Sequence, residues 1–408
     1  MGTAEIAWKA VGAALLARGM PFTLAFTFSC DVDEMCHDVL RAYGSGHIFG
    51  DIIAMLGIRE FDTSWTFARK CRSILAAPAR NVAWCFKCGG HCHVAMGDID
   101  TSGSPCQDWS SAGRGEQHHG KRIHCLLAWM RLHLIAQTAV LIHENVIGFN
   151  IDLLFKFMGH MYYIFSVEAG PEDVGWSCCK RPRVYIALLH RTKTRLLADP
   201  VMIFHAVCQH LRARAPLRIR DCLIAAEQEI RYEELNLAAL RSGVAAASLR
   251  SRWAVPARLG RLAYVLSQGE VDRCHEYARL YFYRTGLAAT SDVDLVCNLG
   301  DNPAGGWLTW SAPPLQMLGC TSPAVHRLPT LRRNWTVQWL PAHGRWLMGS
   351  ERLVSMGFPA TTLLAQHYGL SGQFVLPWAY RHLLGNGMHM ANIGVWQACV
   401  AACVEVVA

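Results

Sequence analysis

The stretch HCLLAWMRLHLIAQTAVLIHENV, residues 124–146, contains the two patterns that decide the fold. Residues 124–137 form an apolar, Leu-rich run long enough for a helix. Residues 138–146 form a shorter apolar run that ends in Glu144 and Asn145, as expected of a buried strand with polar side chains at its carboxyl end. A helix that leads into such a strand is typical of an α/β sheet.

The same alternation extends over the first half of the chain. Helices are predicted at 4–19 and 35–44, and a helix followed by a strand at 152–169. Further β-prone runs lie at 22–33, 47–52 and 183–191. Polar residues follow or precede these strands: Asp31, Asp33, Asp51, Cys106, Glu144, Arg181 and Arg183. We therefore expect a mixed, mostly parallel Rossmann-like sheet with its ligands at the carboxyl edge.

Composition indicates a globular chain with a large core. Of the 408 residues, 52% are hydrophobic and 17% charged, which excludes a disordered protein. The net charge of +8 comes mostly from Arg, and it favours an acidic partner such as nucleic acid. A solubilising basic surface explains the charge equally well.

The cysteines and the C-terminal sequence indicate the cellular compartment in which the protein is expected to fold. The 17 cysteines are an odd number and no secretory signal pattern opens the chain, so free thiols in a reducing compartment are expected. Asn392, Gln397 and Glu405 interrupt the apolar stretch 387–408. That stretch is predicted to be a buried helix rather than a membrane span, and the protein to be soluble.

The polar strand ends suggest a reaction. A thiol at Cys106, a carboxyl group at Glu144 and a pair of arginines would supply a nucleophile, an acid and an electrostatic clamp above one pocket. Asp31 suits the two hydroxyls of a ribose, and Asp51 could accept from an exocyclic amine. Alternatively, Cys106 is one structural thiol among many, and Asp31 and Asp33 cap the helix that follows them.

Six motifs, in order, resemble the cytosine-C5 DNA methyltransferase family over nearly the whole chain. GSPCQDWSSAG (103–113) resembles its catalytic Pro-Cys-Gln loop, HENVIGF (143–149) its Glu-Asn-Val motif and CKRPRVYI (179–186) its Gln-x-Arg-x-Arg motif. FSCDVD with GDI resembles the segments that hold the adenosyl group. RWLMGSERLVSMGFP (345–359) resembles the Arg…Glu…Gly-Phe-Pro segment, and LLGNGMHMANIGV (383–395) the closing Gly-Asn motif.

The resemblance implies S-adenosylmethionine-dependent methylation of carbon 5 of cytosine in DNA, through a covalent adduct with Cys106. Glu144 would hydrogen-bond or protonate the ring at N3, Arg183 with Arg181 would stabilise the developing charge, and the activated carbon 5 would attack the sulfonium methyl. The target base must be flipped out of the duplex. The cofactor-binding residues implied are Gly2, Asp31, Val32, Asp51, Ile52, Pro105 and Asn386.

The resemblance also implies the domain organisation. A class I methyltransferase-type domain would span residues 1–190, a target-recognition region 191–335, and a return to the first domain 336–408. MGTAEIAW matches the tail of the family's first Gly-rich turn, but the strand and aromatic residue before it have no counterpart, so a chain truncated at that strand is expected. Cys179 replaces the usual Gln, and Val32 stands where an aromatic residue often stacks on adenine.

Alternatives follow from these departures. The chain could be a catalytically impaired nucleic-acid-binding or regulatory relative, or a methyltransferase acting on tRNA. We expect a monomer, nuclear if eukaryotic and otherwise cytoplasmic.

In CFKCGGHCH (85–93), Cys85, Cys88 and Cys92 or His93 have the spacing of metal ligands. Because there is no second CxxC pair and the reaction needs no metal, we interpret this segment as an insertion with free thiols, with a structural zinc as the alternative.

Overall fold

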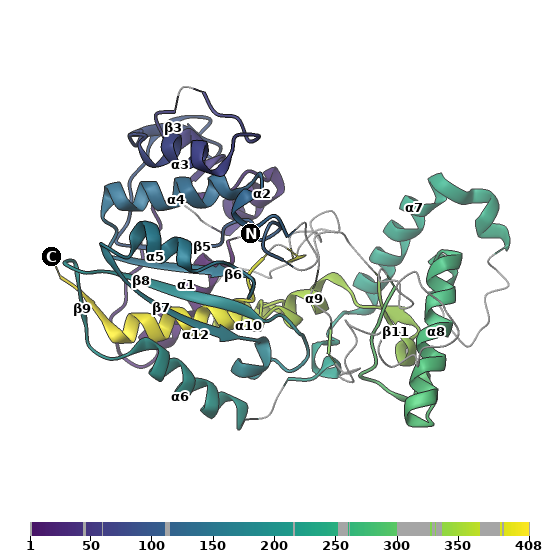
Figure 1. The fold of residues 1–408 in the computed structure, drawn as a ribbon. Helices are drawn as coiled ribbons and strands as arrows, with labels where there is room; N and C mark the ends of the chain where they lie inside the picture. The colour runs from purple at the N-terminus through teal and green to yellow at the C-terminus, as the bar shows by residue number, and fades with distance from the viewer. Residues whose placement is uncertain are drawn as a thin grey trace.

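The computed structural model describes residues 2–43, 46–58, 60–110, 115–214, 217–251, 260, 262–299, 327–328, 331, 337–367, 384–385 and 387–407. Figure 1 shows two lobes, a larger one built on sheets and a smaller one containing α7, α8 and β11. None of the helices in these ranges is both long and apolar enough to cross a membrane.

A four-stranded sheet forms the centre of the larger lobe. Its order is β5 (Ile99–Ser102), β6 (Val140–Asn145), β8 (Arg183–His190), β7 (Tyr162–Ala169). β5 and β6 are parallel, and β8 is antiparallel to both β6 and β7, so three strands share one direction. Every residue of β6 and β8 is buried, which explains the apolar runs at 140–142 and 184–189. The mixed α/β sheet predicted from the sequence is confirmed, although β5–β6 is the one parallel pairing among these four strands and the other two pairings are antiparallel.

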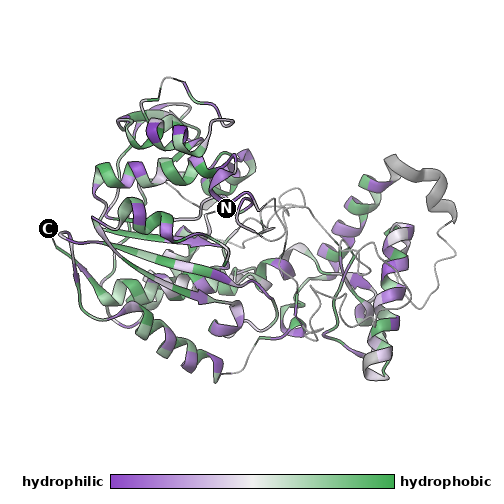
Figure 2. Ribbon diagram, viewed as in Figure 1, coloured by the Kyte–Doolittle hydropathy of each residue, from purple (hydrophilic) through white to green (hydrophobic). Residues whose placement is uncertain are grey.

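Helices cover both faces of this sheet (Figure 1). Alternate strand residues point to opposite faces. Leu141 and Leu188 pack with α4 (Ile123–Ala136) and α5 (Asp152–Met158). Ile142 and Leu189 pack with α1 (Thr3–Leu16), α6 (Pro200–Arg212) and α12 (Met390–Cys403). Figure 2 shows the hydrophobic colour concentrated in these strands and in α4.

A second four-stranded sheet has the order β1 (Phe28–Cys30), β2 (His47–Phe49), β3 (Val82–Cys85), β4 (Gly90–His93). α2 (Glu34–Tyr43) connects the parallel pair β1 and β2, whereas β3 and β4 are an antiparallel hairpin. η1 (Ile52–Met55) and α3 (Phe67–Leu75) lie between β2 and β3 in sequence. Within the described ranges β1 and β5 belong to separate sheets, and no strand joins them.

The C-terminal helix α12 is buried, as the sequence predicts. Ile393, Trp396 and Gln397 have no exposed surface. The Gln397 side-chain amide donates to the Ala4 carbonyl of α1 (3.2 Å) and to the Thr101 hydroxyl of β5 (3.3 Å). After α12, β13 (Val404–Val406) pairs with β9 (Thr194–Leu196). The C-terminal segment therefore helps to hold α1 against the central sheet.

The smaller lobe has its own core. It contains α7 (Glu227–Ser251), α8 (Gln268–Thr285) and the antiparallel strands β10 (Cys297–Asn298), β11 (Gln338–Leu340) and β12 (Arg345–Trp346). Trp339 and Trp346 are completely buried in this core. α9 (Gly349–Ser355) follows β12, and α10 (Thr362–His367) comes next in the chain.

These cores divide the chain differently from the expected boundaries at 191 and 336. Phe204 and Cys208 of α6 belong to the core of the larger lobe, because they pack beneath the sheet with Trp396. Conversely, Trp339 and Trp346 complete the core of the smaller lobe. The loop-rich stretch 301–319 singled out in the sequence lies outside the described residues.

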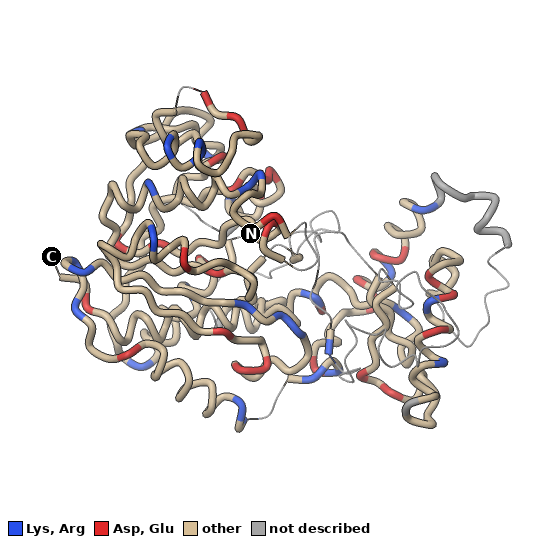
Figure 3. The backbone as a smooth tube through the Cα atoms, viewed as in Figure 1, with Lys and Arg blue, Asp and Glu red and all other residues tan. Residues whose placement is uncertain are grey.

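Several arginines of the region 191–335 are bound to carboxylates. The ion pairs are Arg212–Asp173, Arg220–Asp294, Arg241–Glu270 and Arg327–Glu172. Figure 3 shows basic and acidic positions interspersed over both lobes. Part of the arginine density of this region therefore stabilises the fold.

Candidate active site

The predicted catalytic residues meet at one edge of the central sheet. β5 and β6 end at Ser102 and Asn145. Because β8 runs in the opposite direction, it begins at this edge with Arg183. The loop that follows β5 carries Cys106, which is half-buried. The chain order and strand directions thus bring Cys106, Glu144 and Arg183 to one edge.

The loop that carries Cys106 is fixed to β6 by side chains on either side of Glu144. The Asn145 amide donates to the carbonyl (3.2 Å) and hydroxyl (2.9 Å) of Ser104. His143 bonds through Nδ1 to the Ser102 hydroxyl (3.1 Å) and through Nε2 to the Ser104 hydroxyl (3.2 Å). Sequence reasoning missed His143, Ser104 and the role of Asn145, although two of them flank Glu144 in the motif.

His143 is held in its neutral form. Burial lowers its pKa to about 4, although the nearby Asp100 carboxylate opposes the shift. A neutral imidazole has one donor and one acceptor nitrogen, and hydroxyl groups can serve either. His143 can therefore bond to both serines near pH 7 without introducing a charge beside Glu144.

Glu144 and Arg183 form a buried ion pair. Arg183 Nε lies 3.0 Å from Glu144 Oε1, and the residues are only 7% and 8% exposed. The contact is close but poorly aligned, so Oε1 has no hydrogen-bond donor among the described residues. The charge of this buried oxygen is compensated by the adjacent Arg183 guanidinium.

Arg181 is engaged differently from the prediction that it acts with Arg183 on the substrate. Its guanidinium donates to the carbonyls of Leu331 (3.3 Å), Gly385 (3.1 Å) and Gly387 (2.5 Å). Burial, followed by the charge of Arg183, lowers its pKa to about 10, while Glu144 and Cys106 oppose the shift. Arg181 thus joins the Gly-Asn segment to the site and places a positive charge within electrostatic range of Cys106.

The predicted adenosyl-binding residues lie at the ends of the parallel strands β1 and β2. Asp31 follows β1, and its carboxylate accepts from the Asp33 backbone N–H (3.0 Å). Asp51 follows β2, is exposed, and accepts from the Ile53 N–H (3.0 Å), so it caps η1. Ile52 is half-buried, whereas the Val32 side chain is 71% exposed. Burial, followed by the charges of Asp31 and Asp51, raises the pKa of Cys30 well above its usual range, so both carboxylates are near this thiol.

The three other predicted cofactor-binding residues lie apart from the ends of β1 and β2 in the chain. Gly2 caps α1 with φ of 65°, a conformation that suits glycine, and packs beside Leu40 of α2. Pro105 is half-buried in the Cys106 loop. Asn386 lies outside the described residues.

The predicted metal candidates Cys85, Cys88 and Cys92 lie together, and the structure adds His47 to them. His93, the alternative ligand, is exposed and does not belong to this group. His47 was missed because it comes from another strand.

No protein-family model and no curated protein sequence matches this chain. Its structure is similar to the S. pombe Dnmt2 methyltransferase (13% identity, 96% of this chain and 95% of that chain, TM-score 0.43). It is also similar to a putative DNA modification methyltransferase encoded within an E. coli prophage (12% identity, covering 97% of this chain and 96% of that chain, TM-score 0.45). A third similar structure is a mutant of Spodoptera frugiperda DNMT2 (13% identity, covering 98% of this chain and 97% of that chain, TM-score 0.39). Superpositions of this quality assign no activity to this chain.

Proposed function

We propose that this chain is an S-adenosylmethionine-dependent cytosine-C5 methyltransferase that acts on DNA and forms a covalent bond between Cys106 and the flipped-out base. The observation that carries the proposal is the arrangement at the edge of the central sheet. The Cys106 loop is fixed by Asn145 and His143, and the buried Glu144–Arg183 pair lies on the neighbouring strands.

The residues of the site suit each proton and charge in this reaction. The Cys106 thiolate adds to carbon 6 of cytosine, and the electron pair of the double bond moves to carbon 5. Glu144 protonates or hydrogen-bonds N3, while Arg183 balances the carboxylate charge. Arg181 places a positive charge near Cys106. Once carbon 5 has been methylated, removal of its proton by a base expels Cys106 and restores the ring.

The donor set at β1 and β2 fits S-adenosylmethionine, whose role is to supply an electrophilic methyl group. Asp31 and Asp51 offer carboxylates for the ribose hydroxyls and the adenine amine, and the exposed Val32 offers an apolar surface between them. Motif position assigns four further residues to the same site: Gly2, Ile52, Pro105 and Asn386.

The nucleic acid would contact the region 191–335 as well as the catalytic edge. Arginines that are not paired with carboxylates could contact phosphates there. The base must leave the duplex, because neither face of a stacked cytosine is accessible to a thiol.

Transfer of a labelled methyl group from S-adenosylmethionine to duplex DNA or tRNA tests the proposal and separates the two polymers. A duplex that contains 5-fluorocytosine adds a structural readout, because fluorine cannot leave as a cation and the Cys106 adduct persists. We expect the adduct with the wild type and with Cys71→Ser, a control thiol in α3, but not with Cys106→Ser. Protein that binds the cofactor yet labels neither polymer would refute the proposal.

A catalytically impaired nucleic-acid-binding relative is the second candidate. The observation that favours it is the division of the sheet between β1 and β5. Calorimetry separates the two candidates: nucleic-acid binding without S-adenosylmethionine binding supports the impaired relative.

A further inference from the structure

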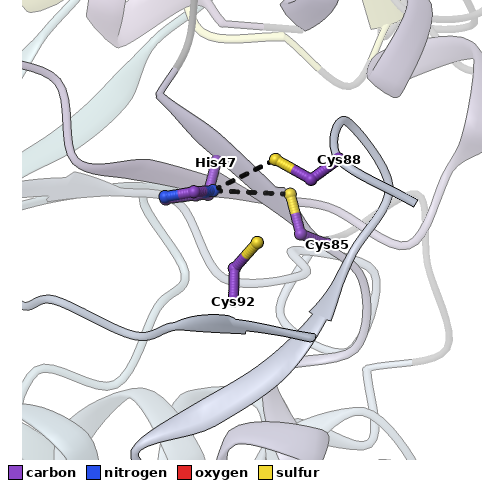
Figure 4. A group of neighbouring side chains, drawn as sticks. All are labelled: His47, Cys85, Cys88 and Cys92. Atoms are coloured by element: carbon purple, nitrogen blue, oxygen red, sulfur yellow. Dashed lines mark hydrogen bonds between the residues drawn. The ribbon is translucent and has the colours of Figure 1, made fainter. Parts of the chain in front are cut away.

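Four potential metal ligands meet where β2 adjoins the β3–β4 hairpin. One ligand atom from each of His47, Cys85, Cys88 and Cys92 lies within 4.8 Å of the other three. Figure 4 shows the three sulfur atoms around the imidazole of His47. His47 Nδ1 is 3.6 Å from both Cys85 Sγ and Cys88 Sγ.

These separations match a tetrahedral zinc centre. With Zn–S bonds of about 2.3 Å and a Zn–N bond of about 2.0 Å, ideal geometry places nitrogen and sulfur about 3.5 Å apart and two sulfurs about 3.8 Å apart. The two measured N···S separations agree with this geometry. The other pairs of ligand atoms lie within 4.8 Å, which exceeds the ideal sulfur–sulfur separation by about 1 Å at most.

We propose that His47, Cys85, Cys88 and Cys92 bind one structural Zn²⁺ ion. Three thiolates and one imidazole are a ligand set that selects zinc over magnesium or calcium. All four positions of a tetrahedral ion are then occupied by protein, so no position is left for water or substrate. The site serves the fold and takes no part in methyl transfer.

The surrounding backbone supports metal binding. The Ile48 N–H donates to Cys85 Sγ (3.4 Å), as backbone amides do around metal-bound thiolates. Cys85 and Cys88 flank a tight turn in which the Gly89 N–H donates to the Cys85 carbonyl (2.9 Å). The sulfur atoms of a Cys-x-x-Cys turn of this kind both face the same point.

The position of the cluster explains what the ion would do. β2 and β3 share a single residue pair in their register, Phe49 with Cys85. A metal bound to His47 at the start of β2 and to the three cysteines of the hairpin would fasten these segments where the ladder is short. Its loss would free the hairpin from the parallel pair β1 and β2.

The competing interpretation is a cluster of hydrogen-bonded thiols without metal, and the metal content of the full chain distinguishes the two. We expect about one zinc per chain in protein purified without chelator. After removal of the zinc, Co²⁺ should produce the thiolate charge-transfer and intense visible bands of a tetrahedral site. His47→Ala and Cys88→Ser should lose both signals, and His93→Ala, which alters an exposed neighbour on β4, should retain them.

Thermal unfolding of the wild type provides a second measurement that does not depend on the folding of the ligand variants. A chelator should lower the Tm of the wild type and of His93→Ala, and added Zn²⁺ should restore it. Wild-type protein that contains no zinc, shows no cobalt spectrum and has a Tm indifferent to chelator would overturn the proposal. So would a zinc content unaffected by His47→Ala.

Discussion

The Asn145 side-chain amide donates to both the carbonyl and the hydroxyl of Ser104, two residues before Cys106. Asn145 also directly follows Glu144 on β6. One buried side chain therefore joins the loop of the proposed nucleophile to the strand of the proposed acid. This relationship gives Asn145 a positioning role that its place in the motif alone does not explain.

Asn145→Ala should lower kcat for methyl transfer about 10- to 100-fold, because a loosened loop misplaces the reacting sulfur. The loss of the two hydrogen bonds should cost about 1–3 kcal/mol of unfolding free energy. Asn150→Ala is the matched control: the Asn150 side-chain oxygen accepts from the Asp152 N–H at the start of α5 (3.0 Å), so its loss should lower stability without a comparable loss of kcat. Equal kcat in the two variants would contradict the positioning role.

The Glu144–Arg183 pair makes a separate prediction. Glu144→Gln keeps the shape but removes the proton donor, so methyl transfer should fall about 10²- to 10⁴-fold. The buried Arg183 would also lose its counter-charge, which should lower the free energy of unfolding by about 3 kcal/mol. Urea unfolding and initial rates measure the two effects. In the double variant Glu144→Gln/Arg183→Gln, stability should partly recover while activity does not.

Acid should destabilise the protein through His143. Burial lowers its pKa from an ordinary 6.5 to about 4, so between these values the unfolded chain binds more protons than the folded one. The stability due to neutral His143 is fully present above pH 6.5 and is lost as the pH falls toward 4, by an amount on the order of 3 kcal/mol. His143→Gln should reduce the decrease in unfolding free energy between pH 7 and pH 4.5. The exposed His93→Ala should leave it unchanged, and an identical decrease in all three proteins would argue against the assignment.

The sequence predicts well those elements whose structure follows from the order of apolar and polar residues along a short segment. β6 and β8 are buried on both faces, so their apolar runs identify them, and the polar residues at their ends reveal the site edge. His47 could not be assigned to the cysteine cluster, because 38 residues separate it from Cys85 and only the pairing of β2 with β3 brings them together.

The two arginines of the motif show the same limit at closer range. They are two positions apart, yet Arg183 faces Glu144 while Arg181 binds carbonyls 150 to 206 residues away. These long-range contacts, which follow from how the C-terminal segment returns to the sheet, distinguish the two side chains.

Gly357 of the Gly-Phe-Pro segment makes the last prediction. Its φ of 82° is unfavourable for any residue with a side chain, and an added Cβ would lie 2.8 Å from the Ala391 backbone nitrogen at the start of α12. Gly19 has a similar φ of 73°, but an added Cβ there meets nothing within 4 Å. Gly19→Ala should therefore cost about 1–2 kcal/mol from the left-handed conformation alone. Gly357→Ala should cost a further 1–3 kcal/mol or so, because the backbone of α12 must shift. Urea unfolding of both variants measures this difference; equal losses would show that α12 does not pack closely against the Gly-Phe-Pro turn.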